Sequence, residues 1–266
     1  MKTRVLSAIL IVLVFIPFLI IGEVPFAVFM SVLSAFALYE LFKVRESKKK
    51  FPLLLKIIGY FIVVAFSLNN FSSVEFKYSF DYRIMAAIIF TFLSPMVFIN
   101  DTKKFNLNDS LFLTGSVLFL GLSFNLIIIT RNYDISYILY LLLVTTITDT
   151  FALFTGKLVG KHKLCPKISP NKTIEGFVGG VLMGTFVATA FYNTVISSSI
   201  SLVLVIFLTM LLCLVGQLGD LVFSSIKRYY DVKDFSNLIP GHGGILDRFD
   251  SLIFVSLAFI LLKGLL

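Results

Sequence analysis

Charged side chains are concentrated near the carboxy-terminal end of this chain. Between Gly219 and Asp250 the sequence holds five Asp, four Lys or Arg and one His. Acids alone repel phosphate, and the usual reason for acids beside cations is Mg²⁺ bridging carboxylate and phosphate oxygens. We therefore expect chemistry on phosphate-bearing molecules here. The alternative is a solvated loop with ordinary salt bridges.

The first part of this stretch has helical spacing. If the preceding helix extends into the cytosol, Asp220, Ser224 and Lys227 lie at positions i, i+4 and i+7, on one face. A carboxylate and a cation then line one wall of the site.

The second part begins the last helix. Asp247 and Asp250 are i, i+3 neighbours, and they follow the pair Gly243 and Gly244, which lets backbone amides approach an anion. A helix amino terminus of this kind suits phosphate. Two Asp from different helices are expected to hold one or two Mg²⁺ ions.

A second polar stretch, residues 156–176, contains five Lys together with hydroxyl and amide side chains. Ser169 or Asn171 is expected to cap the helix that follows, and Lys172 adds positive charge near its amino terminus, which describes an anion site. A topology-setting basic loop explains the number of Lys residues, but it does not explain the order Ser-Pro-Asn-Lys-Thr at 169–173.

Two carboxylates belong to apolar stretches. Asp149 lies inside a span and Glu175 opens the next one; acids at membrane depth are costly, so both are candidate site residues. A buried pair with a Lys is the alternative. Gly176, Gly180 and Gly184 recur every four residues and predict close helix packing, with a lipid-binding crevice as the less favoured interpretation.

The elements that position these residues are apolar helices. Of 266 residues, 58% are hydrophobic and 14% are charged, and the mean hydropathy is +0.98. A soluble chain of this size would have to expose the excess of apolar surface to water. Because open strands leave backbone groups unpaired in lipid, we expect an all-α polytopic integral membrane protein with about nine transmembrane helices. Their windows are 5–22, 24–42, 53–69, 84–100, 111–130, 135–155, 175–194, 200–223 and 251–266.

The distribution of Lys and Arg predicts the orientation. With these spans, 19 of the 23 cations fall on one side, leaving Lys77, Arg83, Arg131 and Lys263 on the other. The positive-inside rule then places the amino terminus in the cytoplasm and the carboxy terminus outside. Residues 1–134 form the amino-terminal helices 1–5, and 135–266 form a catalytic region with cytoplasmic loops 156–174 and 216–250. We expect these two loops to be the only long stretches without regular structure.

Two segments of the chain resemble a known family. The run Ser225–Arg228, then Lys233-Asp234, then Leu238–Asp250 closely resembles the signature of phosphatidate cytidylyltransferases, also called CDP-diacylglycerol synthases. Residues 149–176 resemble that family's second conserved stretch. Together they cover about a quarter of the chain, and the first 140 residues match only in hydropathy.

The resemblance implies a nucleotidyltransferase that joins CTP to phosphatidic acid, forming CDP-diacylglycerol and pyrophosphate. By position, it implies a Mg²⁺ site at Asp220 and Asp247. Spacing and resemblance together give as catalytic residues Asp220, Lys227, Arg228, Asp234, His242, Asp247, Arg248 and Asp250. The predicted substrate-binding residues are Asp149, Ser169, Asn171, Lys172, Thr173, Glu175, Ser224, Lys233, Gly243 and Gly244.

The expected partners are CTP, phosphatidic acid and membrane lipid, with no nucleic acid, and the resemblance implies a homodimer. The site should lie on the cytoplasmic face of the inner membrane, where the nucleotide and the lipid headgroup meet. Two other functions stay open. A CTP-dependent lipid or polyprenol kinase would release CDP, and a secondary transporter would show inverted repeats with sites near the midplane.

Overall fold

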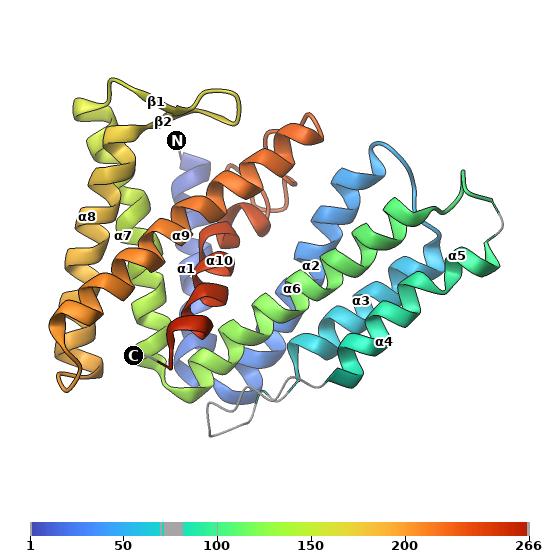
Figure 1. Ribbon diagram of the computed structural model, residues 1–266, viewed down its shortest axis with the longest axis horizontal. Coiled ribbons are helices and arrows are strands. Elements are labelled where there is room, and N and C mark those ends of the chain that lie inside the picture. Colours follow the sequence, from blue (N-terminus) through green and yellow to red (C-terminus); the bar gives the residue numbers. More distant parts are fainter. Residues whose placement is uncertain (1, 70, 72–81, 100, 265–266) are drawn as a thin grey trace. The chain divides into compact units, whose positions relative to one another are not determined.

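The computed structural model describes all residues except 1, 70, 72–81, 100 and 265–266. Lys77 and the last residues of the predicted spans 84–100 and 251–266 lie outside the described part. Within it the regular secondary structure is helical apart from one short hairpin. Its elements are α1 (Lys2–Ile21), α2 (Glu23–Glu46), α3 (Leu53–Ser67), α4 (Tyr82–Leu93), α5 (Pro95–Phe98), α6 (Leu107–Tyr133), α7 (Ile135–Val159), β1 (Lys163–Cys165), β2 (Ser169–Thr173), α8 (Ile174–Phe191), the π-helix η1 (Tyr192–Ile196), α9 (Leu202–Tyr229) and α10 (Leu246–Leu262) (Figure 1).

Each predicted window is largely helical in the described residues. Among the described residues, five helices are long and apolar enough to cross a membrane, as expected of an integral membrane protein: α2, α6, α7, α8 continued by η1, and α9. The window 84–100 is divided between α4 and α5 at Pro95, because proline cannot donate a helical hydrogen bond. The number of about nine spans and the orientation of the termini stay predictions.

The chain forms two compact units. The first comprises Met1–Tyr133 and Asp234–Leu246, with α2, α3 and α6 packed against one another. Its core holds large apolar side chains, including Phe26, Phe42 and Phe124, which are at most 1% exposed. The second unit comprises Asp134–Lys233 and Asp247–Leu266. The predicted functional division at residue 134 stays a prediction.

In the second unit, α7 and α8 lie side by side and are joined by the β1–β2 hairpin at one end (Figure 1). The strands are antiparallel, with Lys163 opposite Thr173. Glycines allow the two helices to approach closely: a Cβ placed on Gly180 would lie 2.6 Å from the Thr148 carbonyl oxygen. The prediction that the glycine repeat serves helix packing is confirmed.

The two polar loops have more regular structure than we expected. Within 156–174, α7 continues to Val159 and the hairpin follows; within 216–250, α9 continues to Tyr229 and α10 begins at Leu246. The prediction of long structureless loops holds only for residues 230–245, which contain no helix or strand, and it is wrong for 156–174 and for the rest of 216–250. A hydropathy window ends where polar residues begin, whereas backbone hydrogen bonds continue a helix beyond that point.

Replacing Gly180 by Ala is expected to destabilise the second unit. The added methyl group would meet the α7 backbone, which cannot move aside as a flexible side chain can. Overpacking of this kind costs about 1–3 kcal/mol. Thermal unfolding in detergent should therefore show a lower Tm for Gly180→Ala. Gly115→Ala is the control, since a Cβ there meets nothing within 4 Å; equal Tm values for the two variants would contradict the packing argument.

Candidate active site

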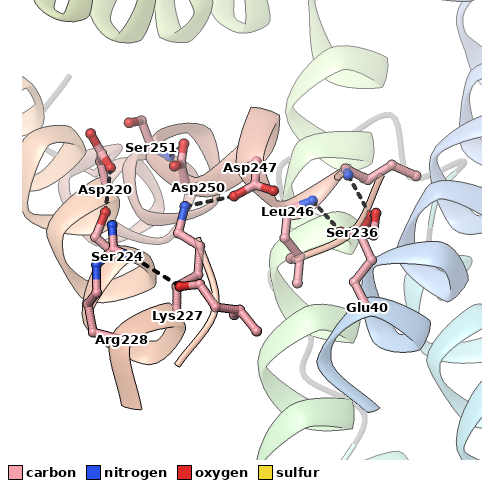
Figure 2. Close-up of polar contacts among 12 residues, drawn as sticks. Glu40, Asp220, Ser224, Lys227, Arg228, Ser236, Leu246, Asp247, Asp250 and Ser251 are labelled. Carbon is pink, nitrogen blue, oxygen red and sulfur yellow. Dashed lines mark hydrogen bonds and ion pairs between the residues drawn. The ribbon is translucent and has the colours of Figure 1, made fainter. Parts of the chain in front are cut away.

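A polar face runs along the carboxy-terminal half of α9. This helix continues to Tyr229, so Asp220, Ser224 and Lys227 lie on one face, as predicted. The Ser224 hydroxyl donates a hydrogen bond to Asp220 Oδ1 at 3.2 Å (Figure 2). One turn of helix therefore connects an acid to a hydroxyl, and the next brings a cation to the same side.

A buried ion pair joins α9 to α10. Lys227 Nζ donates to Asp247 Oδ1 at 2.7 Å, and the two side chains are only 10% and 3% exposed (Figure 2). A charge with so little access to water needs a partner of opposite sign. The structure thus brings together two predicted site residues that are twenty positions apart. The role of Asp247 as a metal ligand stays a prediction.

A second ion pair brings the hairpin to α9. Lys172 Nζ, from β2, lies 2.6 Å from Asp220 Oδ2, and both side chains are about one-quarter exposed, at 23% and 28%. Arg228 also contacts this region, because its Nε donates to the Ile168 carbonyl oxygen at 3.2 Å. Residues of the two polar stretches, from 156–176 and from 219–233, therefore meet within the second unit.

Three carboxylates of the second unit lie close enough to interact electrostatically. Asp220 is a charged neighbour of both Asp149, in α7, and Asp250, near the start of α10. Asp250 precedes the predicted span 251–266; burial raises its pKa to about 7, and the carboxylate of Asp220 adds to the shift. The repulsion between these carboxylates is unfavourable, and a cation bound near them would reduce it.

The hairpin also orders the start of α8. Glu175 accepts hydrogen bonds from the backbone N–H groups of Lys161 and His162, and its Oε1 lies 2.6 Å from His162 Nδ1. The helix cap is Thr173, whose hydroxyl accepts from the Gly176 N–H. The prediction that Ser169 or Asn171 caps this helix is wrong, because both lie in strand β2 and the chain enters α8 later.

The remaining predicted residues of the polar loops are more exposed. Lys233, Asp234 and Arg248 lie at the surface of their own units. Arg228 is exposed too, although its guanidinium also donates to the Val232 carbonyl oxygen. Their predicted roles in binding or catalysis stay predictions.

In the first unit, the segment 234–246 contains a tight turn whose backbone conformation requires glycine. The His242 N–H donates to the Ile239 carbonyl oxygen at 2.9 Å across Pro240 and Gly241, and Gly241 has a φ of 79°. Proline followed by a glycine with positive φ is typical of a type II turn. Gly243, with a φ of 82°, is a second residue in the left-handed region directly after the turn. The substrate contacts predicted for Gly243 and Gly244 stay predictions.

Two residues that sequence analysis missed hold this segment. Ser7, in α1, donates to the Pro240 carbonyl oxygen at 2.9 Å and lies 2.7 Å from His242 Nδ1. Glu40, in α2, accepts from the Ile245 and Leu246 N–H groups, so these two amides of the predicted phosphate site already bind a carboxylate (Figure 2). A lone Glu in the window 24–42 was the only available signal for Glu40.

The acidic residues suit a metal that binds oxygen. Within the part of the chain that the structure describes, no three His, Cys, Asp or Glu side chains are close enough to hold a metal ion by themselves. Mg²⁺ is usually bound by one or two carboxylates, with water and substrate phosphates completing the shell. The oxygen donors around Asp220, which is 28% exposed, fit such a site.

Comparison with known proteins identifies the family. The model of the cytidylyltransferase family matches residues 2–265. The chain is 39% identical over 259 residues to a phosphatidate cytidylyltransferase of Bacillus subtilis (strain 168), covering 96% of this chain and 94% of that one. It is 37% identical to the phosphatidate cytidylyltransferase of Staphylococcus haemolyticus (strain JCSC1435), with 96% of each covered. The chain belongs to the cytidylyltransferase family.

Removing Lys227 is expected to destabilise the second unit more than removing Lys172. Lys227→Met removes the ammonium group that offsets the charge of the nearly inaccessible Asp247, a loss of about 3–5 kcal/mol. Lys172→Met breaks a more exposed pair, worth about 0–1 kcal/mol. Thermal unfolding in detergent measures the difference. The double variant Lys227→Met, Asp247→Leu should recover most of the loss, and a Lys227→Met protein as stable as Lys172→Met would contradict this account.

Proposed function

We propose that this protein transfers the cytidylyl group of CTP to phosphatidic acid, forming CDP-diacylglycerol and releasing pyrophosphate, with Mg²⁺ at the acids of α9 and α10. The observation that carries the proposal is the pairing of acids with cations around α9. Asp220 binds Lys172 and Asp247 binds Lys227, so both polar stretches of the sequence supply charge to one region of the second unit. The relatives that align with nearly the whole chain are named phosphatidate cytidylyltransferases, and these names support the same reaction.

The chemistry needs charge neutralisation more than a strong base. The second ionisation of a phosphate monoester lies near pH 6, so phosphatidate already presents an anionic oxygen nucleophile at pH 7. Its approach to the α-phosphate of CTP opposes two polyanions, and each unit pair at 4 Å costs about 4 kcal/mol at a protein surface. A site for this reaction must therefore supply several positive charges.

The residues of the second unit meet this requirement. Asp220 and Asp247 would hold Mg²⁺, which when bound supplies positive charge between the two phosphate-bearing substrates. Lys172 and Lys227 reach these acids with their ammonium groups, at 2.6 and 2.7 Å, and carry the charge that stabilises departing pyrophosphate. In-line attack on the α-phosphorus then depends mainly on positioning and electrostatics.

The expected location follows from the chemistry of the two substrates. CTP is a cytosolic solute and phosphatidic acid stays in the leaflet, so the polar ends of α7, α9 and α10 should meet both at the cytoplasmic face of the inner membrane. The concentration of Lys and Arg in these loops supports that orientation. The homodimer implied by the family resemblance stays a prediction.

Asp220→Asn and Asp247→Asn are each expected to lower cytidylyl transfer at least 100-fold. Asn keeps the size of the side chain but removes the charge that holds the metal. Purified protein in detergent with CTP, Mg²⁺ and phosphatidic acid provides the assay. Asp231→Asn is the matched control, since Asp231 is exposed, lies between the two site residues in the sequence and has a φ of 56° that Asn tolerates. Near-native turnover of either site variant would overturn its metal assignment.

The products distinguish cytidylyl transfer from the two alternatives. We expect pyrophosphate and CDP-diacylglycerol to appear in equal amounts, to stop on chelation by EDTA and to return when Mg²⁺ is added. Release of CDP with a phosphorylated lipid would instead identify a kinase. Substrate movement across a vesicle without either product would identify a transporter.

A further inference from the structure

Glu40 is a carboxylate inside an apolar helix of the first unit. It belongs to α2, one of the five helices long enough to cross a membrane, and it is 0% exposed. Its Oε1 accepts from the Ser236 hydroxyl at 2.6 Å and from the Ile245 N–H at 2.8 Å, and its Oε2 accepts from the Leu246 N–H at 2.8 Å (Figure 2). Both carboxylate oxygens are thus used to hold residues 236–246.

These contacts satisfy two requirements at once. A buried acid in an apolar span needs hydrogen-bond donors, and the first N–H groups of a helix have no partner within that helix. Leu246 is the first residue of α10, so Glu40 accepts at the positive end of the α10 dipole. A neutral amide at position 40 would place an NH₂ group against one of these donors.

The surrounding sequence is adapted to this approach. A Cβ on Gly244 would clash with Glu40 Oε1, so any larger residue there would displace the carboxylate. The Ser236 hydroxyl also accepts from the Leu238 N–H at 3.2 Å, which extends the contact along the segment. Glycine is therefore needed at position 244 to leave room for the Glu40 carboxylate. This requirement is independent of any role of Gly244 in binding phosphate.

We infer that Glu40 is a positioning residue for cytidylyl transfer, which fixes the backbone at Ile245 and Leu246 directly before Asp247. This inference rests on the proposed function, because its effect on catalysis acts through Asp247. It assigns a task to a helix of the amino-terminal part: α2 supplies the acceptor that the segment 236–246 needs. Displacing a catalytic group by about 1 Å can lower a rate about 100-fold.

The test compares Glu40→Gln with Glu46→Gln, a matched change in the same helix at a residue that pairs instead with Lys56. Hydrogen–deuterium exchange without substrate or metal should show faster exchange of the amides at 236–246 in Glu40→Gln alone. Its kcat should fall about 100-fold while the KM for CTP changes little. Ser236→Ala, which keeps the Glu40 carboxylate and removes one donor, should give intermediate values for both measurements.

Two results would overturn the inference. One is exchange and kcat in Glu40→Gln equal to those of Glu46→Gln. The other is loss of protection throughout the first unit in both Glu40→Gln and Ser236→Ala, which would indicate a role in folding alone. The proposed function fails separately: wild-type protein that makes no CDP-diacylglycerol refutes the reaction, whereas the exchange measurement still reports whether Glu40 holds the segment.

Discussion

The ion pair between Lys227 and Asp247 connects the two helices that carry most of the polar residues of the second unit. Each side chain is almost inaccessible to water, so each depends on the other to offset the cost of burial. Lys172 and Asp220, which join the hairpin to α9, are about one-quarter exposed and depend less on each other. A chain with this much apolar surface buries charged side chains only where groups of opposite charge contact them.

Within the first unit, the amino-terminal helices hold the segment 234–246. Although the segment follows α9 in sequence, it packs with residues 1–133, where Glu40 and Ser7 bind it. Sequence resemblance related only about a quarter of the chain to a family, and the first 140 residues contributed hydropathy alone. The comparisons extend over 96% of the chain, which agrees with a structural task for the early helices.

Local patterns predicted the helices well. Long apolar windows must be helical in lipid, the i, i+4, i+7 spacing placed Asp220, Ser224 and Lys227 on one face, and the glycine repeat indicated close packing of α8. Local patterns were poorer at the ends of elements. The hairpin was missed, and the cap of α8 was placed at Ser169 or Asn171 instead of Thr173, because a cap depends on where the chain enters the helix.

The amino-acid sequence by itself determined the class of protein, the helices and the two polar stretches, since composition, periodicity and motif order are local properties of a chain. The tertiary structure decided which charges meet. That Asp247 binds Lys227, that Lys172 binds Asp220 and that Glu40 accepts from residues about two hundred positions away depends on which helix faces come together. Packing selects those faces, and no pattern within a single helix records the choice.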